Sequence, residues 1–167
     1  GLTLSDIGIY QPKAWSILTR AFAANRVAST YLFWGEEGFG HWQLTLSFAA
    51  LMNCRSTDQS KARPCGECNH CRQIAALGFS GLQIIVPISS HRTMNEAIDL
   101  TNEILEAKRT EPFAIWASAT QTTIPIDLAR EVRSRLALKA EPGMKRVVLF
   151  YQMEKMLHAS ADSLLKL

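Results

Sequence analysis

The sequence predicts an α/β fold, in which helices cover a parallel β-sheet on both faces. Three short apolar runs, at residues 31–34, 83–88 and 146–151, have the length and composition of buried strands. Helical patterns lie between these runs, and such alternation is typical of a parallel sheet. The chain has 167 residues, of which 47% are hydrophobic and 20% charged, as expected for one globular domain.

The N-terminal part of the chain begins with a predicted helix over 12–25. Trp15 and Phe22 recur there at helical spacing, and Pro12 suits the first turn of a helix. We expect these aromatic side chains, and Trp34 in the first strand, to lie in the core.

A glycine-rich segment, GEEGFGHW at 35–42, joins the first strand to an apolar helix predicted over 42–52. Strand, glycine loop and helix in this order are the context that a phosphate-binding loop requires. In such a loop the second glycine is followed by Lys and then by Ser or Thr. The loop positions here are Gly35, Gly38, Gly40, His41 and Trp42. The sequence departs from the pattern at the last two, where His41 replaces the lysine and Trp42 replaces the Ser or Thr.

The second half of the chain continues the alternation of helices and strands. Thr93 and Glu96 form a capping-box pattern that opens an amphipathic helix predicted over 93–108. The other predicted elements are a short helix at 71–77, a looser stretch at 109–123, a helix at about 125–138 that ends before the EPG at 141–143, and a helix from 155 onward.

All four cysteines lie in one short segment, at Cys54, Cys65, Cys68 and Cys71. The two-residue spacers let successive thiolates converge on one tetrahedral ion, and four thiolates form a closed, structural zinc site. The alternative is a set of free or disulfide-bonded cysteines, which a reducing compartment disfavours. His70 can in principle replace one thiolate, but the cysteines already complete the coordination shell.

Composition and charge set further limits. A formal net charge of +3 permits contact with nucleic acid but is too small to indicate it. No apolar run approaches the length of a membrane span, and no secretory signal is visible at the N-terminus. We therefore expect a cytoplasmic protein with no membrane partner.

Several motifs, taken in order, resemble the N-terminal ATPase-like domain of bacterial clamp-loader subunits, the delta-prime and gamma/tau subunits of DNA polymerase III. The matching stretches are YLFWG at 31–35, PCGECNHC at 64–71, IDLAREV at 126–132, EPGMKRVVLF at 141–150 and DSLLK at 162–166. The resemblance covers nearly the whole chain, and its most specific parts are the cysteine module and the C-terminal stretch.

The resemblance implies a P-loop NTPase-like (AAA+) domain over residues 1–167, with an inserted zinc module at 54–71. Residues 89–123 are longer than the usual link in the family, so we expect a surface insertion there. Family members continue beyond the final LLK with another strand, a Ser-Arg-Cys motif, a helical lid and a collar. We therefore expect that the domain is truncated at its C-terminus.

The residues at the expected nucleotide site predict that this site does not bind and hydrolyse ATP. His41 is shorter than lysine and largely neutral at pH 7, and Trp42 offers no oxygen to Mg²⁺. The resemblance also places Tyr151 and Gln152 where an active member has its acidic pair. Two alternatives remain open: an accidental glycine turn, and a weak anion site that has been retained. The delta-prime subunit commonly lacks a functional ATP site, so these substitutions favour it over gamma/tau.

The favoured hypothesis is a non-catalytic, stator-like subunit that packs against other clamp-loader subunits and helps to place the sliding clamp on primer-template DNA. The alternatives are a working ATPase of the gamma/tau type and a zinc-dependent module that binds nucleic acid. Arg130 matches a family position on the helix that faces DNA, so it is a candidate phosphate contact. Alternatively, Arg130 belongs to a solvated helix face.

Overall fold

The computed structural model describes residues 6–28, 40–85, 88–89, 93–111, 122–123, 130, 134, 137–138 and 141–150. Its elements, in chain order, are α1 (Ile7–Tyr10), α2 (Pro12–Ala23), α3 (His41–Asn53), α4 (Asn69–Ala75), β1 (Leu82–Ile85), β2 (Ile88–Ser89), α5 (Met94–Thr110), β3 (Thr122–Thr123) and β4 (Val147–Phe150). The predicted strand at 31–34, most of the predicted helix at 125–138 and all of 151–167 lie outside the described residues.

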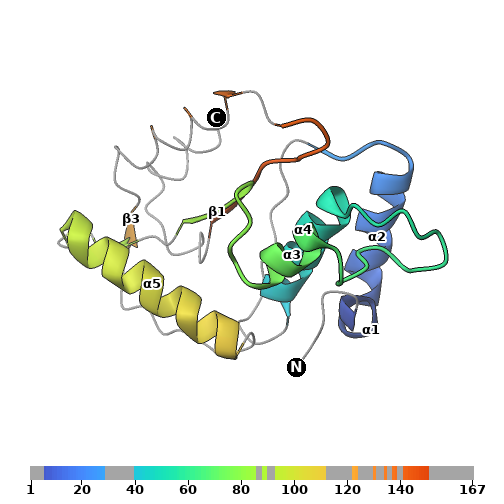
Figure 1. Ribbon diagram of the computed structural model, residues 1–167. Coiled ribbons are helices and arrows are strands. Elements are labelled where there is room, and N and C mark those ends of the chain that lie inside the picture. The colour runs from blue at the N-terminus through green and yellow to red at the C-terminus, as the bar shows by residue number, and fades with distance from the viewer. Residues whose placement is uncertain are drawn as a thin grey trace.

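The parallel pairing that the sequence predicts is present between β1 and β4. Leu82 lies opposite Val147, and the register continues to Ile85 opposite Phe150. In Figure 1, α3 and α4 lie in the middle of the molecule, α1 and α2 on the right, and α5 on the left. The described fold is thus a mixture of helices and strands around a small parallel sheet.

One predicted strand was too long. The run at 83–88 is divided, because β1 ends at Ile85 and β2 belongs to a second sheet, in which it pairs antiparallel with β3. Proline has no N–H to donate to a strand ladder, and position 87 between β1 and β2 is a proline. The described part of the fold therefore contains an antiparallel pair in addition to the parallel one.

Helix α3 is apolar on two sides and connects two clusters of buried residues. On one side, Trp42 and Leu46 pack in a cluster with α4, β4 and Ile104 of α5. On the other side, Leu44, Phe48 and Leu51 pack with Ile7 of α1 and Leu18 of α2. The predicted core residues Trp15 and Phe22 pack against this second cluster but are only partly buried, whereas Trp34 lies outside the described residues.

Helix α5 begins as the sequence predicts. Thr93 Oγ1 accepts a hydrogen bond from the backbone N–H of Glu96, and the Glu96 carboxylate accepts one from the backbone N–H of Thr93. This reciprocal pair satisfies two backbone donors that the first turn of the helix leaves free. The helix belongs to the predicted insertion at 89–123 and packs into the core through Ile104.

Candidate metal centre

The four cysteine side chains converge on one point, although they come from three different local structures. Their Sγ atoms all lie within 4.8 Å of one another. Cys54 follows the last residue of α3, Cys68 caps the N-terminus of α4, and Cys71 lies in the first turn of α4. Cys65 precedes Gly66, whose φ of +72° is a left-handed conformation that favours glycine.

Backbone N–H groups point at the sulfur atoms. The N–H of Cys65 donates to Cys54 Sγ at 3.5 Å, the N–H of Cys68 donates to Cys65 Sγ at 3.3 Å, and the N–H of Cys71 donates to Cys68 Sγ at 3.5 Å. Such bonds stabilise the charged form of an acceptor, so the local backbone favours thiolates. The segment is thus built to hold negative sulfur atoms close together.

The thiols differ in how easily they lose a proton. Burial raises the pKa of Cys65, but hydrogen bonds from the N–H groups of Cys68 and Glu67, together with the neighbouring thiols, outweigh it and lower that pKa to about 6. Burial raises the pKa of Cys71 well above the ordinary range of a thiol. A bound metal must therefore displace the proton of Cys71, and binding should release protons.

The donor set fits a tetrahedral metal. Zinc bonded to sulfur at about 2.3 Å requires sulfur atoms about 3.8 Å apart, which the observed upper limit of 4.8 Å accommodates. No disulfide joins any of the four cysteines. His70 is not a member of the cluster: its Nδ1 lies 2.9 Å from the carbonyl oxygen of Asn53, and its ring packs against Phe79. The four cysteines can therefore hold a metal ion without help from the histidine.

The metal centre is continuous with the core. Cys71 has no solvent-exposed surface and belongs to the cluster that contains Trp42, Ile74 and Phe79. The other three cysteines are partly buried and pack against the same cluster. The packing of α3 and α4 therefore depends on how these four side chains are held together.

Asn53, which the sequence analysis did not single out, ties the metal segment to β4. Its side chain is only 1% exposed, and its Nδ2 donates to the carbonyl oxygens of Ala49 and Lys145, each at 3.0 Å. Its Oδ1 accepts a hydrogen bond of 2.7 Å from the N–H of Lys145. Because Lys145 lies two residues before β4, this one amide holds the start of that strand beside the first cysteine.

A second contact joins the same two segments. Arg55 Nη2 donates to the carbonyl oxygen of Pro142 at 3.1 Å. Pro142 belongs to the turn that the sequence predicts as the stop at 141–143, and Gly143 in this turn has a φ of +77°. The EPG turn thus packs beside the cysteine module.

The glycine loop is described only at its end. Gly35 and Gly38 lie outside the described residues, whereas Gly40 has a φ of +90° and forms the N-cap of α3. His41 is the first residue of the helix. A left-handed N-cap favours glycine, which explains why the second glycine of the loop frame is present here.

Trp42, the last residue of the predicted loop, lies in the core. Its side chain is 5% exposed and packs in the core with Leu46 and Ile104. Lys108 of α5, also 5% exposed, places its Nζ 5.5 Å from the centre of the Trp42 ring. A cation at that distance from an indole ring is attracted to its face. The residue at which the sequence departs from the phosphate-loop pattern is thus a core residue.

The remaining candidate site residues are less informative. Arg130 is exposed, and most of its sequence neighbours lie outside the described residues. Tyr151 and Gln152 also lie outside them. The structure thus brings the four cysteines together but does not connect Arg130 with the metal centre or with the loop.

Comparison with known proteins gives the family. A family model described as "DNA polymerase III, delta subunit" matches residues 10–167. The chain belongs to this family. The resemblance to DNA polymerase III subunits is thereby confirmed at the level of the family, and no solved structure matches the chain significantly.

The individual proteins that match this member of the delta subunit family include further subunits of DNA polymerase III. The chain is 26% identical over 114 residues to "DNA polymerase III subunit tau" of Escherichia coli (strain K12), a match that covers 68% of the chain and 17% of the relative. It is 29% identical over 110 residues to "DNA polymerase III subunit tau/gamma" of Haemophilus influenzae, covering 66% of the chain and 15% of the relative. "Protein STICHEL-like 4" of Arabidopsis thaliana is 44% identical over 54 residues, 32% of the chain and 5% of the relative. The matches thus span only a small part of each relative.

Among the helices of the described residues, none combines the length and the apolar character that crossing a membrane requires.

Proposed function

We propose that this chain is the AAA+-like domain of a clamp-loader subunit of the delta-prime type, which keeps the fold of an ATPase and has lost its chemistry. The observation that carries the proposal is the burial of Trp42 at the position where an active loop offers a hydroxyl to Mg²⁺. A side chain packed among Leu46 and Ile104 contributes to stability, and it has no oxygen to bind a metal.

The resemblance to clamp-loader subunits supports the other parts of the proposal. Residues 1–167 form the domain, the module at 54–71 binds Zn²⁺ structurally, and residues 89–123 are an insertion. The partners are other clamp-loader subunits and, through the complex, the sliding clamp and primer-template DNA. Arg130 is a candidate contact to a DNA phosphate. This setting is cytoplasmic and involves no membrane.

Zinc is the metal we propose because of the donor set. Four sulfur ligands in a tetrahedron are typical of Zn²⁺ or of iron–sulfur chemistry, whereas Mg²⁺ and Ca²⁺ prefer oxygen. All four positions of such a site are taken by protein, so the ion has no open position for a substrate water. Its role is therefore to hold the segment after α3 against α4.

A second candidate function has one observation in its favour. The curated relatives that cover most of the chain are named tau or tau/gamma subunits. The resemblance implies that gamma/tau subunits can be working ATPases, so this function requires His41 and Trp42 to be tolerated in an active site. The two candidates differ directly in whether the pure chain binds and hydrolyses ATP.

We expect no saturable heat when Mg·ATP is titrated into the pure chain, and no phosphate release above the rate without protein. The missing lysine and hydroxyl remove the contacts to the β- and γ-phosphates and to the metal. An intact tau subunit, titrated in the same buffer, serves as the positive control. Measurable turnover by the unmodified chain would overturn the non-catalytic proposal in favour of the ATPase.

The double variant His41→Lys/Trp42→Thr tests whether restoring the two loop residues is enough to restore activity. We expect it to remain inactive, since the acidic pair would still be replaced by Tyr151 and Gln152. It should also be less stable by about 3–5 kcal/mol, the usual cost of removing a large aromatic side chain from a core. Its folded fraction must therefore be measured by urea titration before the activity is compared.

A further inference from the structure

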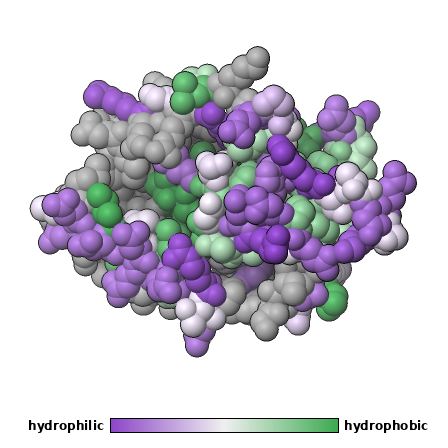
Figure 2. Space-filling view, viewed as in Figure 1, coloured by the Kyte–Doolittle hydropathy of each residue, from purple (hydrophilic) through white to green (hydrophobic). Residues whose placement is uncertain are grey.

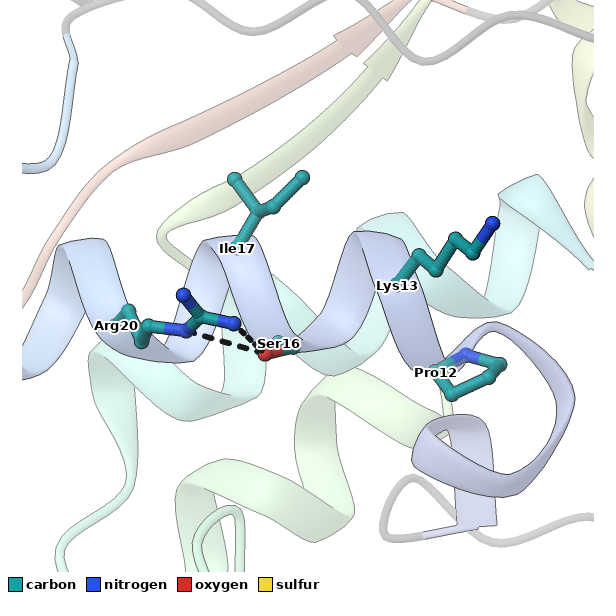
Figure 3. A pocket seen from close by; sticks show the side chains of 5 residues that line it. All are labelled: Pro12, Lys13, Ser16, Ile17 and Arg20. Carbon is teal, nitrogen blue, oxygen red and sulfur yellow. Dashed lines mark hydrogen bonds between the residues drawn. The ribbon is translucent and has the colours of Figure 1, made fainter.

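Helix α2 exposes one face that combines apolar and basic side chains. Ile17 is 64% exposed, and a shallow hollow of about 430 Å³ lies along this face. The residues that line the hollow are Pro12, Lys13, Ser16, Ile17 and Arg20 (Figure 3). Helix α2 contains no Asp or Glu. The face is therefore positively charged around an exposed isoleucine.

The two cations of this face have no carboxylate partner among the described residues. Arg20 donates from Nε and Nη2 to the hydroxyl of Ser16, at 3.2 and 2.8 Å, and this neutral group fixes the guanidinium along the helix. Neither Lys13 nor Arg20 takes part in an ion pair with any residue that the structure describes. Lys13 also lies in the first turn, where the helix dipole adds to its positive potential.

Helix α5 exposes a face of the opposite sign. Ile98 is 51% exposed, and the carboxylates of this helix are Glu96, Asp99, Glu103 and Glu106, with no Lys or Arg before Lys108. Glu96 serves the capping box and Glu106 pairs with Arg109. Within the described residues, Asp99 and Glu103 form no ion pair. Figure 2 shows hydrophilic side chains over the side of the molecule on which α5 lies.

The charges of the two faces lie along comparable lengths of helix. Lys13 and Arg20 are seven residues apart, and Asp99 and Glu103, the two carboxylates without an ion pair among the described residues, are four apart. At a rise of about 1.5 Å per residue, these pairs span about 10 Å and about 6 Å along their helices, a difference that long lysine and arginine side chains can bridge. Each helix also carries one exposed isoleucine, Ile17 on α2 and Ile98 on α5.

We propose that the exposed face of α2 binds the exposed face of α5 of a second copy of this chain. The two helices lie at opposite ends of the molecule, so one chain cannot join its own faces (Figure 1). Because the contact joins two different surfaces, it leaves one face of each kind free and assembles a series of oligomers. Two helix faces bury less area than a stable dimer needs, so the association is weak and dependent on salt.

Sedimentation velocity over a concentration series tests this proposal. At low salt, the average sedimentation coefficient of the chain should rise with concentration, and at high salt it should fall to the monomer value. The variants Lys13→Glu/Arg20→Glu and Asp99→Lys/Glu103→Lys should each weaken the association about tenfold or more, because each replaces attraction by repulsion. Circular dichroism and thermal melting should show that both variants fold.

Mixing the two variants gives the sharper result. The first variant keeps an acidic α5 and the second keeps a basic α2, so the mixture should associate although neither variant does so alone. The variant Arg26→Glu/Lys145→Glu changes the net charge by the same amount as the first variant, but at exposed positions outside α2 and α5, and it should associate like the unmodified chain. A chain that stays monomeric at low salt overturns the proposal. Association that persists in each of the two variants also overturns it, and so does a mixture of the two variants that remains monomeric.

Discussion

Replacing Cys71 with serine is expected to remove the metal and to lower the melting temperature of the chain by more than about 10 °C. Cys71 has no exposed surface and lies among Trp42, Ile74 and Phe79. A serine hydroxyl does not replace a thiolate as a ligand, and it would leave a polar group in an apolar setting. Differential scanning calorimetry together with metal analysis measures both effects.

Removing the metal from the unmodified chain is the control for this prediction. After treatment with a strong chelator, the unmodified chain should melt close to the Cys71→Ser variant, with only the smaller difference that a buried hydroxyl causes. The effects of chelator and substitution should therefore add only in part, because both act mainly through the same ion. If the variant kept one metal per chain, or melted like the metal-bound protein, the proposed role of Cys71 would be wrong.

Replacing Asn53 with alanine should lower the free energy of unfolding by about 2–4 kcal/mol. The amide of Asn53 is 1% exposed and makes hydrogen bonds to both the N–H and the carbonyl oxygen of Lys145. Without the Asn53 side chain, the N–H and the carbonyl oxygen of Lys145 lose their hydrogen-bond partners just before β4. The segment that carries the cysteines is then no longer linked to the sheet through this residue. Urea unfolding measures the change.

Asn102 on the exposed side of α5 provides the matched control. Its replacement with alanine makes the same chemical change at an exposed helix position, so we expect a change within about 0.5 kcal/mol. Equal effects of the two substitutions would show that the hydrogen bonds of Asn53 contribute nothing specific.

Local patterns in the sequence predict the elements that depend on near neighbours. The helix at 42–52 and the capped helix at 93–108 correspond to α3 and α5, with ends that differ by at most two residues. The cysteine spacing predicts the convergence of the four sulfur atoms, because two-residue spacers leave few other arrangements. In each case the decisive contacts join residues that are close in sequence, at most 17 positions apart in the cysteine cluster.

Contacts between distant segments are what the sequence could not predict. Asn53 reads as an ordinary polar residue at a helix end, yet its partner Lys145 is 92 positions away. The two-residue strands β2 and β3 carry too few residues to show a period of two. The loop pattern predicts only that Trp42 does not act as the hydroxyl residue of a phosphate-binding loop, whereas its place in the core beside Lys108 depends on how α5 packs.

The most direct test of the account is the metal content of the chain purified without chelator. Four convergent thiolates in a closed site predict about one zinc per chain by plasma mass spectrometry, with the cysteines slow to react with a thiol reagent until the metal is removed. A well-folded chain that contains no metal and has four rapidly reacting thiols would contradict it.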